Sequence, residues 1–137
     1  MLPHRTTYRV IYGDTDKMGY AYNANYLRWF EIGRSELFRA HGFPYKAIEQ
    51  GGIFLPLSEV HCKFTAPVQY DDLLVIETRI DTAIKGGMKF DYTIYTDEHD
   101  TVGARGYTIH ACVDHNGKVV RPPAFLRKAI ADICGNS

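Results

Sequence analysis

The chain has 137 residues, 45% of them hydrophobic and 23% charged, which is the composition of a folded protein with one core. Sixteen basic and sixteen acidic residues cancel, so we expect neither nucleic acid nor an anionic membrane as a partner. No run of about 18 apolar residues occurs, and the N-terminal segment soon reaches a charged residue. We therefore expect a cytoplasmic protein without membrane spans, formed by a single domain over residues 1–137.

The first predicted elements are a strand and a long helix. Residues 5–12 are rich in β-branched and aromatic side chains, which favours a strand that ends at Gly13. Residues 23–41 are apolar around most of a helical circumference, which predicts a mostly buried helix. Gly33 within this helix predicts the close approach of another backbone. A narrow polar stripe along it consists of Arg28, Glu31, Ser35 and Arg39.

Four further segments are predicted to be strands, at about 53–66, 72–84, 87–97 and 102–114. Alternate residues share one face in two of them, namely Leu74, Ile76, Thr78 and Ile80 in the second and Met88, Phe90, Tyr92 and Ile94 in the third. Turn signals occur at 69–72, 86–87, 97–100 and 115–118, which predicts successive hairpins in an antiparallel meander. Residues 125–133 predict a short C-terminal helix that ends at Gly135.

These elements define an α+β fold in which a curled antiparallel sheet of five or six strands wraps around one long central helix. A single curled sheet leaves two edge strands with unpaired backbone groups, and pairing between subunits is one ordinary way to cover them. We therefore expect a homodimer or a homotetramer.

Two carboxylates precede the central helix. Asp14 and Asp16 lie too far from its predicted start to cap it, and we expect Asn23 or Asn25 to do so. The exposed N–H groups at a helix start can stabilise the oxyanion that forms during acyl transfer, while a carboxylate attacks the carbonyl carbon or activates water. A thioester suits such a pair, because its thiolate leaves readily.

Other catalytic chemistries find less support in the residues. Ser35 falls on the helix, Ser58 in a strand and Ser137 at the end of the chain, and no Gly-x-Ser-x-Gly turn occurs, so a serine hydrolase is not expected. His61 and His110 occur in predicted strands, where a histidine is more often a core or pocket-edge residue than a metal ligand. The cysteines, Cys62, Cys112 and Cys134, are far apart. We expect no metal site and no disulfide framework.

The run GDTDKMGYAYNANYLRWFE, residues 13–31, resembles the signature of the 4-hydroxybenzoyl-CoA thioesterase-like hotdog family, in which an Asp-x-x-Gly loop leads to Asn-Tyr at the start of the central helix. The residues that match are Asp16, Gly19, Asn25 and Tyr26. The segment KFTAPVQYDDLLVIET, residues 63–78, resembles the strand, turn and strand that follow in the family. The resemblance extends over almost the whole chain and implies a hotdog-fold acyl-CoA thioesterase.

The resemblance also implies roles for individual residues. By this resemblance, Asp16 would be the catalytic carboxylate, acting as nucleophile or general base, and the backbone N–H of Asn23 would hold the thioester oxygen. Aromatic side chains with a polar end suit the walls of an acyl or aryl pocket, so we expect Tyr20, Tyr22 and Tyr26, with the motif residues Gly19 and Asn25, to bind the substrate. Lys85 and Lys89 flank a Gly-Gly turn and would contact the phosphates of coenzyme A, which enters as part of the substrate, so no separate cofactor is expected. Many family members have histidine where this chain has Asn23, so a side-chain role of that histidine is lost here.

Several alternatives remain open at this stage. The tyrosines can pack in the core, the two lysines can simply be solvated at a turn, and Asp14 can either order the loop or share a proton with Asp16. An acyl-carrier-protein thioester is an alternative substrate to acyl-CoA. A non-catalytic acyl-ligand-binding or scaffold protein is the main alternative function on the same fold. A hotdog dehydratase is less favoured, because that chemistry requires a histidine-centred acid-base site that the loop lacks.

Overall fold

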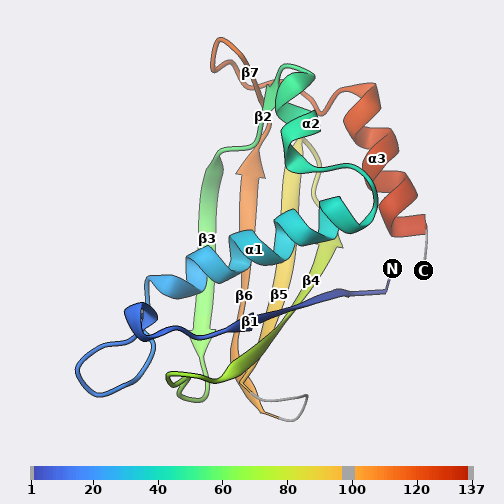
Figure 1. Cartoon of the computed structure of the whole chain (residues 1–137). Helices are drawn as coiled ribbons and strands as arrows, with labels where there is room; N and C mark the ends of the chain where they lie inside the picture. Colours follow the sequence, from blue (N-terminus) through green and yellow to red (C-terminus); the bar gives the residue numbers. More distant parts are fainter. Residues whose placement is uncertain (1, 97–100, 136–137) are drawn as a thin grey trace.

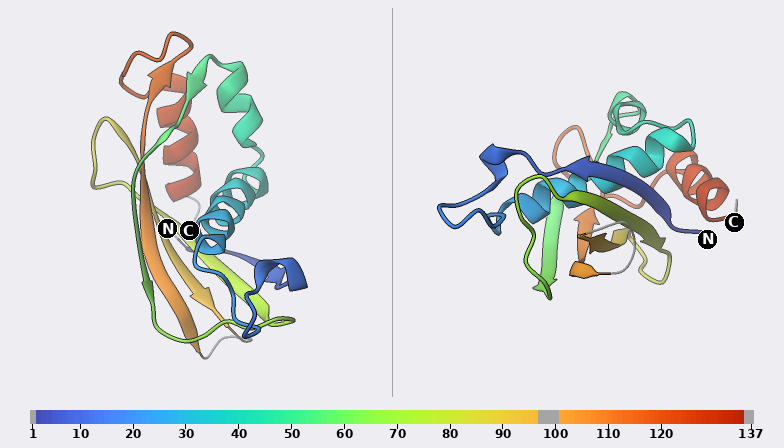
Figure 2. Two further views of the ribbon diagram at one scale, coloured as in Figure 1. Left: turned by 90° about the vertical axis from the view of Figure 1, so that its left-hand side faces the viewer. Right: turned by 60° about the horizontal axis from the view of Figure 1, so that its bottom comes forward.

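The computed structural model describes residues 2–96 and 101–135 of the chain. In chain order its elements are β1 (His4–Arg9), the 3-10 helix η1 (Tyr12–Asp14), α1 (Asn25–Ala40), α2 (Tyr45–Gln50), β2 (Ile53–Phe54), β3 (Leu57–Phe64), β4 (Leu73–Asp81), β5 (Gly87–Tyr95), β6 (Val102–Ala111), β7 (Val113–Asp114) and α3 (Ala124–Gly135). Figure 1 shows α1 lying across one face of the main sheet, and Figure 2 shows how the sheet curves around it. The predicted fold class is therefore confirmed.

The main sheet has five strands in the order β1-β4-β5-β6-β3, and every neighbouring pair is antiparallel. The predicted meander is correct for β4, β5 and β6. It is wrong for β3, which pairs with β6 instead of β4. The connection over residues 65–72 thus runs from the edge strand β3 to β4 near the opposite edge of the sheet. It passes beside the loop that precedes α1, where Tyr20 forms a bridge with Gln69.

The core lies between α1 and the sheet. Trp29, Phe30, Leu37 and Phe38 of α1 are fully buried, and the side chains on the predicted inward faces of β4 and β5 are buried as well. The ring of Phe30 stacks on Tyr92 with a centroid distance of 4.2 Å. A side chain at Gly33 would overlap the side chains of Thr78 and Ile76, so the predicted close approach is to side chains of β4 and not to another backbone.

The central helix and the segment after it differ from the prediction. The central helix begins at Asn25, two residues later than expected, and its N-cap residue Ala24 contributes no side-chain hydrogen bond. The short helix α2 was not predicted, although Pro44 before it and Gly51 after it are ordinary boundary residues. The C-terminal helix is present as predicted, with slightly wider bounds. None of the helices within the described residues is long and apolar enough to cross a membrane.

The predicted strands are shorter in the structure. The first ends at Arg9, because the chain turns into η1. Pro56 separates β2 from β3, since proline cannot donate a hydrogen bond to the ladder. The 115–118 hairpin turn is confirmed, with Gly117 at φ +79° and Asp114 N–H donating to Lys118 O at 2.9 Å. The turn expected at 97–100 lies outside the described residues.

Candidate active site

The loop between η1 and α1 folds back on itself like a small hairpin. Thr15 forms a bridge with Ala21, Asp16 N–H donates to Tyr20 O at 2.8 Å, and Gly19 N–H donates to Asp16 O at 3.0 Å. Gly19 has a φ of +80°, a conformation that glycine adopts without a steric penalty. Asp16, the predicted catalytic carboxylate, therefore lies on an ordered turn at the surface.

The Asp16 side chain has one engaged and one available oxygen. Its Oδ1 accepts hydrogen bonds from the backbone N–H groups of Met18 at 2.9 Å and Tyr20 at 3.3 Å. Within residues 2–96 and 101–135, no group donates to Oδ2. The carboxylate is exposed to solvent, so an oxygen atom is free to approach a water molecule or a substrate.

The start of α1 offers unpaired donors. The expected side-chain cap by Asn23 or Asn25 is wrong, because Asn25 Nδ2 instead donates to Asp14 O at 2.7 Å. In the described part of the chain, the backbone N–H groups of Asn23 and Ala24 have no acceptor. These groups lie where the helix dipole concentrates partial positive charge, which favours a negatively charged oxygen nearby.

Asp14 is buried, with 2% of its side chain exposed. Its carboxylate accepts hydrogen bonds from Tyr8 Oη at 2.7 Å and Ile11 N at 3.0 Å, and it forms an ion pair with Arg28. Burial and this carboxylate together raise the pKa of Tyr8. Asp16 is not among the hydrogen-bond partners of Asp14, so the contacts favour the loop-ordering role over a shared proton.

The predicted substrate-binding tyrosines fall into two groups. Tyr20 and Tyr22 belong to the loop and are 36% and 62% exposed, so their rings are accessible from solvent. Tyr26 is buried and packs edge-on against Trp29 and Phe64, each at a centroid distance of 4.8 Å. Burial raises the pKa of Tyr26 to about 12. Its contacts are those of a core residue next to the site.

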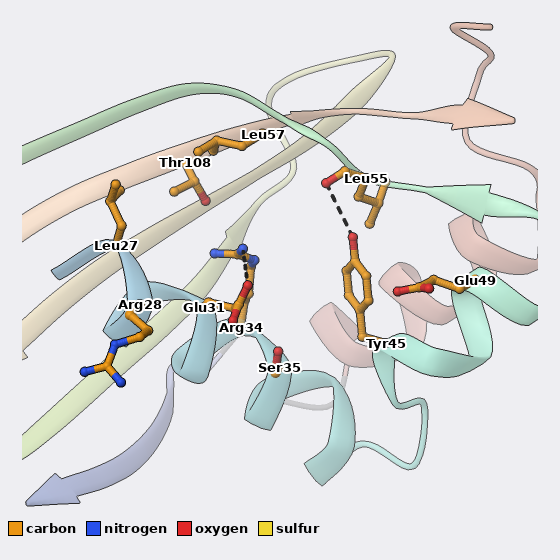
Figure 3. Close-up of a pocket in the computed structure, with 10 residues that line it drawn as sticks. All are labelled: Leu27, Arg28, Glu31, Arg34, Ser35, Tyr45, Glu49, Leu55, Leu57 and Thr108. Carbon is orange, nitrogen blue, oxygen red and sulfur yellow. Dashed lines mark hydrogen bonds and ion pairs between the residues drawn. The ribbon is translucent and has the colours of Figure 1, made fainter. Parts of the chain in front are cut away.

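A polar cavity of about 590 Å³ begins one turn beyond the start of α1 (Figure 3). The residues that line it are Leu27, Arg28, Glu31, Arg34, Ser35, Tyr45, Glu49, Leu55, Leu57 and Thr108. Under it, Tyr92 Oη and Thr108 Oγ1 are 2.7 Å apart, and Thr108 Oγ1 lies 2.9 Å from His110 Nε2. The sequence did not indicate this cavity, because its walls come from elements that are distant along the chain.

A second cavity, of about 720 Å³, lies between the β4–β5 turn and α3. Its floor is apolar, and its cationic residues are Lys85, Arg121 and Arg127. The sequence indicated only Lys85 of these three, because Arg121, which precedes α3, and Arg127, which lies on it, are both distant from Lys85 along the chain. Lys89 lies outside the lining, where its Nζ is 3.3 Å from Asp81 and 3.9 Å from Asp91, and the Asp81 carboxylate raises the pKa of Lys89.

Comparison with known proteins identifies the family of the chain. A model of the thioesterase-like superfamily matches residues 10–130. The chain is 30% identical over 124 residues to the acyl-CoA thioester hydrolase YbgC of Escherichia coli O6:H1, covering 90% of each chain, and 30% identical over 125 residues to the acyl-CoA thioesterase YbgC of Haemophilus influenzae, covering 90% of this chain and 88% of the relative. The structure of Slr0204, a 1,4-dihydroxy-2-naphthoyl-CoA thioesterase from Synechocystis, superposes with a TM-score of 0.84 at 25% identity, covering 95% of this chain and 96% of the other.

An antiparallel sheet that curves around one long buried helix is the hotdog fold of thioesterase-like proteins. The chain belongs to the thioesterase-like superfamily. The resemblance seen in residues 13–31 and 63–78 is thereby confirmed.

Proposed function

We propose that this protein is an acyl-CoA thioester hydrolase that converts a thioester and water into a free acid and coenzyme A. Membership of the thioesterase-like superfamily supports the reaction class. The observation that carries the proposal for this chain is that one short segment holds the accessible Asp16 carboxylate and the backbone N–H groups of Asn23 and Ala24, for which the described residues offer no acceptor. The same short segment thus supplies a nucleophile or base and an oxyanion donor.

In this proposal Asp16 either attacks the thioester carbon or removes a proton from the attacking water. The backbone N–H of Asn23 donates to the carbonyl oxygen as negative charge develops on it, which lowers the energy of the transition state. The thiolate of coenzyme A then leaves and takes up a proton. Where Asp16 has attacked the carbon, water next hydrolyses the acyl-aspartate anhydride, which releases the free acid and restores the carboxylate. No cofactor or metal is required, because a thiolate is a good leaving group.

The same loop supplies the proposed acyl-binding residues. Tyr20 and Tyr22 form an aromatic wall beside the carbonyl, and Gly19 keeps the turn free of a side chain. Asn25 and Tyr26 support the wall from the first turn of α1, through the Asn25 bond to Asp14 and the packing of Tyr26 on Trp29.

We propose that the second cavity, between the β4–β5 turn and α3, holds the phosphates of coenzyme A. We call this the cationic cavity. Lys85, Arg121 and Arg127 line it, and Asp81 is the acidic residue in that lining. Arginine and lysine side chains donate strong hydrogen bonds to phosphate oxygens. Lys89 adds charge from outside the lining, where Asp81 and Asp91 already offset part of it.

The Asp16 loop and the cationic cavity of one subunit lie far apart. A homodimer, alone or as half of a homotetramer, could bring the loop of one subunit close to the cavity of the other. The Asp16 loop contacts the chain just before β4, and Lys85 follows the end of β4. The first and last residues of the nine-residue strand β4 are eight steps apart, which is about 26 Å at a rise of about 3.3 Å per residue. The edge strand β3 exposes Leu57, Val60 and Phe64, so pairing of two β3 edges would cover apolar surface and bring a second cationic cavity closer to the loop.

A cytoplasmic location is part of the proposal. Cys62 and Cys112 are thiols that form no disulfide within the described residues. Reducing compartments keep cysteines in this form, whereas secreted proteins of this size often form disulfides.

The proposal is tested by hydrolysis of a panel of thioesters, with a thiol-trapping reagent that reports the released thiol. The panel contains acyl-CoAs of graded chain length, aryl-CoAs and an acyl-carrier-protein thioester. Turnover of any CoA thioester supports the proposal, and preference for the carrier-protein thioester would identify the other substrate class. Binding of acyl-CoA by calorimetry without turnover of any panel member would favour a non-catalytic ligand-binding protein.

A further inference from the structure

Asp14 is a buried charge with an unusually complete set of partners. Taking a carboxylate out of water is costly unless hydrogen bonds and a counter-charge compensate it. One carboxylate oxygen of Asp14 pairs with Arg28, and the other accepts from Tyr8 Oη at 2.7 Å and from Ile11 N at 3.0 Å. The carboxylate therefore connects β1, the start of η1 and the second turn of α1.

The backbone oxygen of Asp14 has a second set of partners. It accepts a hydrogen bond from Tyr22 N at 2.9 Å and another from Asn25 Nδ2 at 2.7 Å. The loop over residues 15–22 therefore starts and ends at the same peptide group. Its two ends are further joined by the bridge between Thr15 and Ala21.

The two proposed catalytic groups lie at the ends of this closed loop. Asp16 is two residues after Asp14, and Asn23 is one residue after Tyr22, whose N–H is bound to Asp14. Arg28 extends from α1 to the Asp14 carboxylate, and its side chain also lines the polar cavity. Any displacement of Asp14 would change the position of Asp16 relative to the start of the helix.

We propose that Asp14 and Arg28 act together as positioning residues, which hold the Asp16 carboxylate and the Asn23 N–H in the relative placement that thioester hydrolysis requires. This inference rests on the proposed function. Neither residue is proposed to contact the reacting atoms. Misplacement of a catalytic group by about 1 Å can lower the rate about 100-fold, so loss of the pair acts on the chemical step.

The expected signature is a split between the two kinetic parameters. Arg28→Met removes the counter-charge but keeps an unbranched side chain over the cavity, and we expect kcat to fall about 30-fold or more with KM changed less than about three-fold. Arg28→Lys restores a positive charge and should recover part of kcat. Arg39→Met is the matched control. Like Arg28, Arg39 lies on α1 and forms an ion pair with a carboxylate, but its partner is Glu36 on the same helix, and the pair is exposed and remote from the loop.

A double-mutant cycle distinguishes positioning from general destabilisation. If Asp14 and Arg28 act as one unit, Asp14→Asn combined with Arg28→Met should lower kcat little more than either change alone. Thermal melting of each variant shows how much folded protein is assayed. Multiplicative effects of the two changes would contradict the joint role.

Amide hydrogen exchange provides a readout that does not depend on activity. Arg28→Met should increase exchange at the amides of residues 16–23 at least about ten-fold relative to Arg39→Met, because the loop loses its anchor. Equal exchange and equal kcat in the two variants would overturn the inference, even if the wild type hydrolyses thioesters. If the wild type hydrolyses none, the proposed function fails, and the exchange comparison alone decides whether Asp14 and Arg28 order the loop.

Discussion

Asp16 and Asp114 stabilise their turns in the same way. Oδ1 of Asp16 accepts the N–H groups of the residues two and four positions later, at 2.9 and 3.3 Å, and Oδ1 of Asp114 does the same at 2.9 and 3.0 Å. Asp114 lies before the 115–118 hairpin, in another part of the fold. Turn formation by an aspartate is therefore separable from any catalytic role, and Asp114 is a matched control for Asp16.

Neutralising Lys85 should weaken the interaction with coenzyme A. We expect Lys85→Gln to raise KM for an acyl-CoA about five-fold or more, because a charged donor to a phosphate is lost from the cavity. Lys89→Gln should raise KM less, since the Lys89 charge is partly offset by Asp81 and Asp91.

The control for this prediction is a substrate that lacks the phosphates. The same acyl group on a short, uncharged thiol should show equal KM values for Lys85→Gln and the wild type. An equal rise in KM for both substrates would contradict phosphate binding by Lys85.

A charge on the edge strand β3 should separate the subunits. Val60 is 41% exposed in the centre of this strand, and a lysine there would place charge in the proposed subunit contact. We expect Val60→Lys to halve the molar mass measured by light scattering or sedimentation. Thr7→Lys on the opposite edge, β1, should leave the mass unchanged. A wild-type protein that is monomeric at micromolar concentration would contradict pairing through β3.

His110 should make the stability of the protein depend on pH. The imidazole is 2% exposed, and it lies 2.9 Å from both Leu55 O and Thr108 Oγ1, which suits a neutral ring with its proton on Nδ1. Burial, aided by the nearby Arg34 charge, lowers the pKa of His110 from 6.5 to about 4. The unfolded chain therefore binds a proton near pH 6.5 that the folded protein does not bind until about pH 4.

The sign of the effect follows from this difference in proton binding. The contribution of His110 is fully present above pH 6.5 and is lost as the pH falls to 4, by up to about 3 kcal/mol of unfolding free energy. Urea unfolding between pH 4.5 and 7.5 should thus show a smaller loss of stability at low pH for His110→Gln than for the wild type. The exposed His61→Gln variant should retain the wild-type dependence, and a His110→Gln curve parallel to the wild type would contradict the explanation.

The alternation of apolar and polar residues correctly predicted which side chains of the central strands are buried. The alternation in β4 and β5 predicted that Ile76 and Phe90 are buried, because each strand contributes one face to the core. The pairing of β3 with β6 could not be predicted from turn signals, since it depends on where the 65–72 connection crosses the sheet. Helix α2 has only six residues, too few for a helical period to be visible.

The sequence predicted the loop residues of the candidate site but not the contact that anchors the loop to α1. The loop signature indicated Asp16 and Asn23, because both lie within one short segment of sequence. The contact between Arg28 and Asp14 depends on which face of α1 points towards the loop, and this is set by packing of the opposite face on the sheet. A residue contact across 14 positions has no signal in a single sequence.

The central claim is that Asp16 carries the chemical step of thioester hydrolysis. Its most direct test is kcat for the best acyl-CoA of the panel, measured for the wild type, Asp16→Asn and Asp114→Asn under identical conditions. We expect kcat of Asp16→Asn to fall about 100-fold or more with its thermal melting curve retained, while Asp114→Asn keeps the wild-type kcat. Equal kcat values for Asp16→Asn and Asp114→Asn would contradict the claim.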